Sequence, residues 1–164
     1  MKIYEVIVVG GEGFDDLKAV LRLRESDCLV QNSNYINGMT SSIKEGVANA
    51  TGDAFIICLG DMPQLNTECY SSMVEAYMAT YSRNAKAIMS PVVNGVRGNP
   101  VIFSGAHKKE IMENAQPNGC KSVIDKNARD LLLFESEDVA FLNDIDTPED
   151  YQQLLHESEQ RRAN

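Results

Sequence analysis

The sequence predicts one α/β domain in three layers, with a mostly parallel sheet covered by helices on both faces. Apolar runs of strand length alternate along the chain with segments whose apolar residues recur at helical spacing. The run Phe55–Leu59 is apolar throughout and ends at a glycine, which is typical of a strand buried on both faces. A chain of 164 residues suits a single domain, which we expect to span 1–164 with a frayed tail over 156–164.

Composition narrows the classes of function. The formal net charge of -9 argues against binding to nucleic acid or to an acidic membrane surface. No apolar run reaches membrane-spanning length and the first residues do not form a signal peptide, so we expect a cytoplasmic location. The four cysteines are scattered without a CxxC pair, which predicts buried free thiols in a reducing compartment.

The first third of the chain predicts two strands, each followed by a helix. The strands are Lys2–Val9 and Cys28–Val30, and Asp15 lies at the start of the helix between them. A polar, turn-prone segment over 32–39 then leads into a second helix. The apolar face of that second helix consists of Ile43, Val47 and Ala50.

The remainder predicts more alternation of helices and strands. Asn66 or Thr67 caps a long helix, and Pro91–Asn99 is expected to be a loop. Thr147 and Pro148 are typical of the start of a last helix, which we expect to pack through its apolar residues. The helical stripe assigned to the core is Tyr70, Met73, Val74, Tyr77, Met78 and Tyr81. The later strands are Ala87–Met89, Val101–Phe103, Leu131–Phe134 and Val139–Leu142, and the last helix would pack through Tyr151, Leu154 and Leu155.

Two acidic turns are candidate metal-binding positions. Asp61 comes directly after the apolar run 55–59, at the carboxyl end of a strand, where ligands bind in open α/β sheets. A carboxylate there suits Mg²⁺, with substrate phosphates as further ligands, although a plain turn aspartate has the same pattern. Asp144 and Asp146 form a second turn, where either acid could be a solvated turn residue; if this turn lay beside Asp61, two carboxylates would share one metal.

Other polar segments are candidates for binding a ligand. Gly38 and Met39 precede hydroxyls at the start of a helix, an arrangement that offers N–H groups to a base or phosphate; plain N-capping is the alternative. Arg97 and Gly98 lie in a sharp loop where glycine permits close approach to a ligand, and Lys121 is a second cation. Neither GxGxxG nor GxxxxGK[ST] is present, so the common dinucleotide and P-loop fingerprints are absent.

Five segments, taken in order, make the chain resemble the MobA-like nucleotidyltransferases, and among them the molybdenum cofactor cytidylyltransferases. They span nearly the whole chain. The segments are GMTSSIKEGV at 38–47, CLGDMPQL at 58–65, GVRGNPVIF at 95–103, PNGCKSVI at 117–124 and DIDTPEDY at 144–151. The resemblance implies a Rossmann-like fold of the nucleotide-diphospho-sugar transferase type, and transfer of CMP from CTP to molybdopterin with release of pyrophosphate.

The resemblance also implies roles for particular residues. Asp61 looks like the principal Mg²⁺ ligand, and Asp146, or less favourably Asp144, looks like the second. The residues that resemble the loop at the nucleotide base are Gly38, Met39, Ser41 and Ser42. The residues that resemble the acceptor-facing loops are Arg97, Gly98, Asn99, Pro100 and Lys121, with Asn99 where family members often have histidine.

The chain departs from the family pattern at its start. The family opens with a strand and the segment LAAGxSxRxG, which cradles the triphosphate, whereas Met1 here already belongs to what looks like the family's second strand. We therefore expect an N-terminally truncated fold with a gap in the sheet, and a free edge of this kind favours a homodimer. Two alternatives to an active enzyme follow: a non-catalytic remnant that binds a pterin, a nucleotide or a protein, and a shortened gene.

Overall fold

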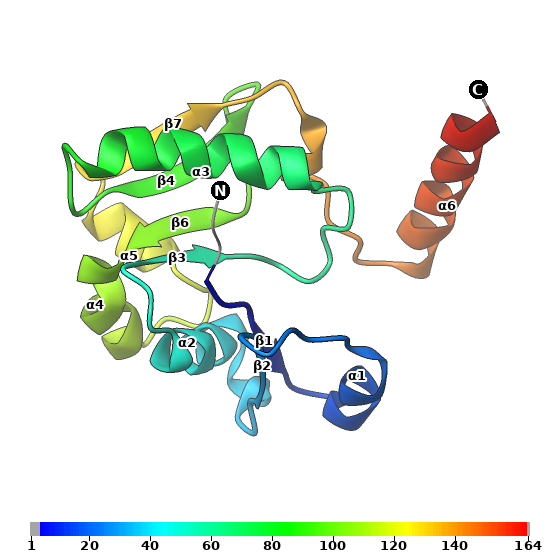
Figure 1. Cartoon of the computed structure of the whole chain (residues 1–164), viewed down its shortest axis with the longest axis horizontal. Helices are drawn as coiled ribbons and strands as arrows, with labels where there is room; N and C mark the ends of the chain where they lie inside the picture. The colour runs from blue at the N-terminus through cyan, green and yellow to red at the C-terminus, as the bar shows by residue number, and fades with distance from the viewer. Residues whose placement is uncertain (1–3, 164) are drawn as a thin grey trace.

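A computed structural model describes residues 4–163 of the chain and the side chains of residues 4–156. Helices and strands alternate along most of its length (Figure 1). The strands are β1 (Ile7–Gly10), β2 (Cys28–Gln31), β3 (Ala54–Ile57), β4 (Ile88–Val93), β5 (Val96–Arg97), β6 (Val101–Ser104) and β7 (Leu131–Glu135). The α-helices are α1 (Phe14–Val20), α2 (Met39–Asn49), α3 (Thr67–Tyr81), α4 (Lys108–Glu113), α5 (Lys121–Lys126) and α6 (Pro148–Ala163). Three short 3₁₀ helices are η1 (Tyr35–Asn37), η2 (Gly105–His107) and η3 (Val139–Phe141).

The larger of two sheets has β4 at its centre. β4 pairs with β7 in parallel on one side, and with β6 and β5 in antiparallel fashion on the other. β3 pairs with the far edge of β6, also antiparallel. Since both β3 and β4 are antiparallel to β6, the strands β3, β4 and β7 run in the same direction and their carboxyl ends share one edge of the sheet.

Alternate residues of β4 and β6 pack on opposite faces of this sheet, as the two-residue period of a strand requires. Ile88 and Phe103 lie in the core beneath α2, α4 and α5, whereas Met89 and Ile102 lie in the core beneath α3. Every residue of β4 and β6 is buried. Helices thus cover both faces (Figure 1), and the three-layer α/β fold predicted from the sequence is confirmed.

Among residues 4–163, the smaller sheet consists of β1 and β2, which pair in parallel. Within that part of the chain β1 is not paired with β3, so each of these strands lies at an edge. The connection from β2 through α2 to β3 is a strand–helix–strand crossover, the kind that joins parallel strands. The gap that the sequence led us to expect therefore lies between β1 and β3.

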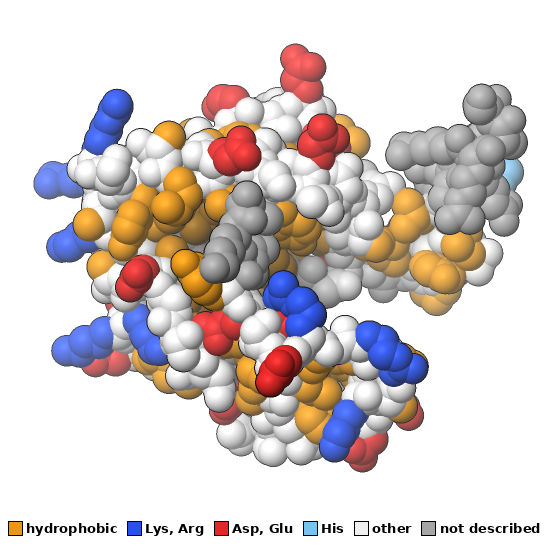
Figure 2. Space-filling model, in the orientation of Figure 1, with side chains coloured by type: hydrophobic (Ala, Val, Ile, Leu, Met, Phe, Trp, Pro, Cys, Tyr) orange, Lys and Arg blue, Asp and Glu red, His pale blue; other side chains and the backbone are white. Residues whose placement is uncertain are grey.

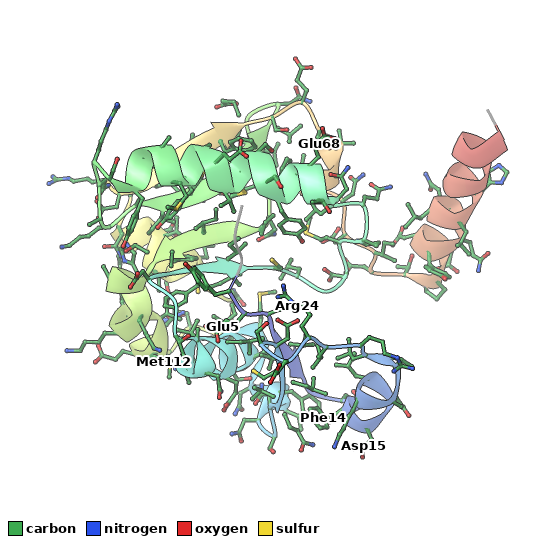
Figure 3. The ribbon with its side chains drawn as sticks, in the orientation of Figure 1. Glu5, Phe14, Asp15, Arg24, Glu68 and Met112 are labelled. Atoms are coloured by element: carbon green, nitrogen blue, oxygen red, sulfur yellow. The ribbon has the colours of Figure 1, made fainter. Side chains whose placement is uncertain are left out.

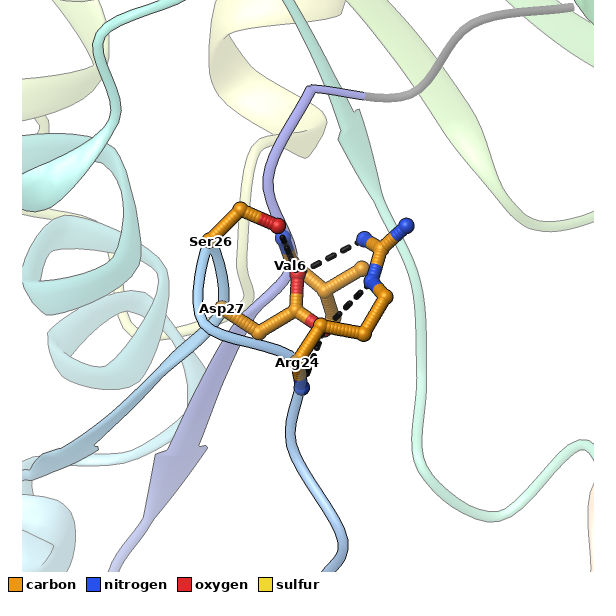
Figure 4. A network of polar contacts seen from close by, with 4 residues as sticks. All are labelled: Val6, Arg24, Ser26 and Asp27. Atoms are coloured by element: carbon orange, nitrogen blue, oxygen red, sulfur yellow. Dashed lines mark hydrogen bonds and ion pairs between the residues drawn. The ribbon is translucent and has the colours of Figure 1, made fainter.

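The carboxylate of Asp27, in the loop before β2, ties that loop to the amino end of β1 (Figure 4). Asp27 accepts hydrogen bonds from Val6 N at 3.0 Å and from Arg24 Nε and Nη2 at 2.8 and 2.7 Å. The guanidinium of Arg24 is the main reason why the pKa of Asp27 lies well below its usual range. The anchoring is therefore strongest when Asp27 is ionised.

Several local expectations were wrong. The segment Val139–Leu142 was expected to be a strand, but most of it forms η3, because Asp138 accepts a hydrogen bond from Ala140 N and caps a helical turn. The segment Pro91–Asn99 was expected to be a loop, but it contains the end of β4 and all of β5, joined by a two-residue turn at Asn94 and Gly95.

The cysteines are free, as predicted, but only Cys69 and Cys120 are buried. Cys28 and Cys58 are exposed, because β2 is an edge strand and β3 ends at Ile57, one residue before Cys58. Among the described helices, none is long and apolar enough to cross a membrane.

The last helix departs from its expected position. α6 projects from the body of the molecule instead of packing on it (Figure 1). Its side chains Tyr151 and Leu155 are 51% and 39% exposed, although they were expected to pack against the core. Thr147 Oγ1 and Asp150 Oδ2, 2.8 Å apart, close the first turn, so this helix owes its start to local capping.

Candidate functional site

The two acidic turns singled out in the sequence are adjacent in the fold. Asp61 follows β3 in an exposed turn, and its carbonyl oxygen accepts a hydrogen bond from Ile145 N at 2.9 Å. Ile145 lies between Asp144 and Asp146, whose side chains are also exposed. Asn143 Nδ2 donates to Gln64 Oε1 at 3.0 Å and joins the same two segments a second time. The backbone therefore holds three carboxylates on neighbouring turns at the carboxyl end of β3.

This donor set can serve a hard cation only together with a ligand. Among the described residues no three His, Cys, Asp or Glu side chains gather as a closed metal site. Mg²⁺ commonly binds through one or two carboxylates and completes its octahedron with water and substrate phosphates. Two exposed carboxylates on adjacent turns fit that arrangement, which leaves room for a phosphorylated substrate.

The loop after β5 lies beside the second acidic turn, but its glycine serves the fold. Asn99 N donates to the carbonyl oxygen of Phe141 at 3.0 Å, and Phe141 is the last residue of η3. A Cβ on Gly98 would lie 2.0 Å from the same oxygen. The close approach at Gly98 is thus to the protein's own backbone, and Pro100 is fully buried.

The two candidate cations meet at one carboxylate that the sequence did not single out. Lys121 Nζ lies 2.9 Å from Asp125 Oδ2, and Arg97 Nη2 lies 4.0 Å from Asp125 Oδ1. The hydrogen bond from Lys121 is the main cause of the lowered pKa of Asp125. All three side chains are largely exposed, so an incoming anion can displace Asp125 from the cations at little cost.

The start of α2 is fixed by a residue that sequence analysis missed. Thr40 is buried, and its Oγ1 donates to the carbonyl of Gln116 and accepts from Gly119 N at 2.9 Å. Gly38 before it has φ +87°, which favours glycine. Thr40 lies within a run of three hydroxyls, so the pattern drew attention to the segment but not to the one residue that holds it.

The flanking hydroxyls are engaged within the loop. Ser41 Oγ donates to the carbonyl of Gly38 at 2.8 Å, and Asn32 Nδ2 donates to the Oγ atoms of Ser41 and Ser42 at 2.8 and 3.0 Å. Met39 is 49% exposed beside Gly119. Ser41 and Ser42 therefore shape the loop, and Ser41 also lines a pocket beside it.

A pocket of about 310 Å³ lies between α2 and the loop that follows α4. Asn34, Asn37 and Gln116 contribute side-chain amides to its wall, and Lys44 contributes a cation. None of these four side chains forms a hydrogen bond or ion pair with the part of the protein that the structure describes. Amides can donate and accept at once, as the edge of a nucleobase requires.

Hydrogen bonds and an ion pair connect, one after another, the segments that carry the predicted residues. Asp61 is hydrogen-bonded to Ile145, and Asn99 is hydrogen-bonded to Phe141. The chain between Phe141 and Ile145 therefore lies between the turn after β3 and the loop after β5. Arg97, the last residue of β5, reaches Asp125 of α5, and the loop before α5 is tied to the start of α2. The first and last of these segments lie on different sheets, because Asp61 follows β3 and α2 follows β2.

The fold and site together define a class. A three-layer α/β domain whose polar loops gather beyond the carboxyl ends of its strands, at the point where the chain changes direction, is a ligand-binding domain of the doubly wound type. The MobA-like NTP transferase domain matches residues 1–131, and the chain belongs to that family. The fold predicted from the resemblance is thereby confirmed.

Individual relatives are more distant. The molybdenum cofactor cytidylyltransferase of Escherichia coli (strain K12) is 28% identical over 153 residues, which are 89% of this chain and 71% of that protein. Rv0371c from Mycobacterium tuberculosis H37Rv has a similar fold, with a TM-score of 0.75, 19% identity, and coverage of 93% of this chain and 75% of that one. A structure described as a manganese complex of Rv0371C has a TM-score of 0.65, 20% identity, and coverage of 93% and 78%.

Proposed function

We propose that this protein transfers CMP from CTP to a molybdopterin-like phosphorylated acceptor and releases pyrophosphate. The observation that carries the proposal is the hydrogen bond between Asp61 and Ile145, which places the two acidic turns side by side. Asp61 and Asp146 would hold a divalent cation, for which we propose Mg²⁺. When bound, that cation would supply positive charge to offset the phosphate charge at the reacting centre.

The remaining residues bind and orient the two substrates. The pocket bounded by Asn34, Asn37 and Gln116 would take the base of the nucleotide. Arg97 and Lys121, released from Asp125, would take the phosphate of the acceptor. In-line attack of that phosphate on the α-phosphate forms the new P–O bond, and the bond to pyrophosphate breaks. Catalysis of this kind depends mainly on positioning and on charge.

Calorimetric titration of CTP with Mg²⁺ tests the assignment. We expect Asp61→Asn to weaken metal-dependent CTP binding at least tenfold, because it removes a charged metal ligand. Asp53→Asn is the matched control, since Asp53 is an exposed aspartate directly before β3, at the opposite end of that strand. Undiminished binding by Asp61→Asn, or an equal loss in the control, would contradict the proposal.

The gap between β1 and β3 favours a second candidate, a chain that binds pterin, nucleotide or a protein without turnover. Loss of one group that clamps a phosphate commonly costs about 3 kcal/mol of transition-state stabilisation. Pyrophosphate release with CTP and molybdopterin separates the two candidates. Binding without release of pyrophosphate would favour the non-catalytic function.

A further inference from the structure

The edge strand β7 is less protected than sheet edges usually are. It pairs with β4 on one side, and within the described residues no strand pairs with its other side, which is the sheet edge opposite β3 (Figure 1). Proteins usually protect such an edge with lysine, proline or a bulge, because its free N–H and C=O groups pair readily with another strand. β7 reads LLLFE and pairs with β4 over five consecutive residues without a bulge. Only its last residue, Glu135, is of the protective kind.

Two hydrogen bonds show which backbone groups of β7 are free. Ile88 N donates to the carbonyl oxygen of Asp130 at 2.9 Å. Ser136 N donates to the carbonyl oxygen of Val92, also at 2.9 Å. In a parallel ladder the residues of a strand face the partner strand alternately, so the even-numbered residues from 130 to 136 bond to β4. The residues whose N–H and C=O groups point away from the sheet are therefore Leu131, Leu133 and Glu135.

The side chains of β7 are covered everywhere except at its middle and its end. Leu132 and Phe134 pack in the core beneath α3, and Leu131 packs against the core on the opposite face of the sheet. Leu133 lies on the same face as Leu131, because side chains alternate along a strand, but it is 51% exposed. An apolar side chain is therefore open to solvent at the centre of an unpaired edge.

The edge is complementary to itself. The ladder from Asp130 to Ser136 is centred on Leu133. Arg129 directly precedes this ladder and Glu137 directly follows it, and both are exposed. Neither forms an ion pair within the part of the chain that the structure describes. An antiparallel pair of β7 strands centred on Leu133 would therefore place each arginine opposite the glutamate of the other copy.

We propose that two copies of this chain associate through β7, in an antiparallel pair with a twofold axis at Leu133. Each outward-facing residue of one strand would exchange both backbone hydrogen bonds with the residue opposite it. The two Leu133 side chains would cover each other. Glu135 would lie diagonally across from Arg129 of the other copy, within reach of a long side chain, so the protective charge of this edge becomes an attractive one. Such a dimer uses the same surface on both copies, as twofold symmetry requires.

The charge of the chain disfavours other ways of pairing. Two chains of net charge -9 repel each other, and Figure 2 shows exposed acidic side chains over α3, the helix that covers one face of β7. A parallel pair of β7 strands would place arginine beside arginine and glutamate beside glutamate. The antiparallel pair alone gives attraction at both ends. None of these residues belongs to the candidate site, so the inference does not depend on the proposed function.

Sedimentation equilibrium of the full chain tests the association, in about 0.15 M salt to screen the long-range repulsion. We expect a monomer–dimer equilibrium. Arg129→Glu should raise its Kd about tenfold, and so should Glu137→Arg, because two attractive pairs become repulsive. An equimolar mixture of these two variants should recover dimerisation, since each copy then supplies the charge that the other needs. Lys18→Glu, in α1 on the far side of the molecule from β7 (Figure 1), is the matched control.

A second variant tests the centre of the pair. Leu133→Lys should leave the chain monomeric, because two lysines would face each other across the axis. Met112→Lys is the matched control, since Met112 is an exposed apolar side chain on α4, away from β7 (Figure 3). Amide exchange followed by NMR then identifies the strand. In the monomeric variant Leu132 and Phe134 should be protected, and in the wild-type dimer the amides of Leu131, Leu133 and Glu135 should become protected as well.

The possible outcomes separate the alternatives. A dimer that the β7 variants weaken, that the mixture restores and that protects the outward amides of β7 supports the proposal. A chain that stays monomeric at every soluble concentration overturns it. A dimer that protects β1 or β3 instead, or that the β7 variants leave unchanged, also overturns it. Protection of β7 in a monomeric chain, seen only with a different protein present, would assign this edge to that protein and overturn self-association.

Discussion

At the scale of single residues, several polar side chains hold segments that are distant in sequence. Thr40 joins the start of α2 to Gly119, and Asp27 joins the loop before β2 to Val6. Thr40 lies in a segment that the sequence singled out and Asp27 does not, but the sequence predicted neither contact, because each residue acts through backbone groups that the fold brings to it. Polar anchors of this kind are therefore visible only in the structure.

Asp27 gives a prediction for the dependence of stability on pH. Its folded pKa lies below the ordinary 3.8, so its stabilisation is complete above that value and is lost as the pH falls from there toward the folded pKa. Asp27→Asn should lower the urea midpoint by the same amount at pH 6 and pH 5, and by less at pH 3. The same measurement on Asp53→Asn, an exposed aspartate, serves as the control. A difference that stays constant or grows on acidification would contradict this assignment.

At the scale of elements, α6 projects from the body of the protein, and we expect it to contribute little to stability. Ending the chain at Asp150 keeps the capping hydrogen bonds of Thr147 and removes most of the helix. We expect the free energy of unfolding to change by less than about 0.5 kcal/mol. Met73→Ala in α3, where the side chain is 1% exposed, should cost about 2–5 kcal/mol by comparison. A loss of similar size on truncation, measured by urea unfolding, would show that α6 packs on the domain.

The elements predicted correctly from the sequence are those with a strong period or a strong cap. The stripe from Tyr70 to Tyr81 predicted α3, and its cap is Asn66, whose Oδ1 accepts from two backbone N–H groups. The strand expected at Val139–Leu142 is apolar enough, but a short apolar run does not distinguish a strand from a helical turn. The sequence predicted that α6 would pack through its apolar residues, but Tyr151 and Leu155 are 51% and 39% exposed.

At the scale of the whole molecule, the division into two sheets should make protection uneven. β4 is paired on both sides and fully buried, whereas β1 is paired on one side only. We expect amides of β1 and β2 to exchange at least tenfold faster than those of β4 and β6, because local opening needs fewer contacts to break. Equal protection in native-state hydrogen exchange would indicate one cooperative sheet.

The candidate site could be predicted in part. The sequence predicted that Asp61 would lie at the carboxyl end of a strand, and the adjacency of Asp61 and Ile145 was foreseen only as a condition. Asp125 and Gln116 were missed, because an isolated polar residue forms no pattern in the sequence until the fold places it beside others. The roles assigned to these residues stay predictions until binding is measured.

The hydrogen bonds that shape the site join early parts of the chain to late ones. The hydrogen bond between Thr40 and Gly119 cannot form until Gly119, 79 residues later, has been synthesised. The bond between Asp61 and Ile145 likewise requires Ile145. At 5–20 residues per second, the ribosome needs about 4 to 16 seconds to add those 79 residues. The residues of the first strands and helices are therefore synthesised well before all the residues of the site are present. A product of interrupted translation that stops short of Ile145 would lack the site even if its first two-thirds had folded.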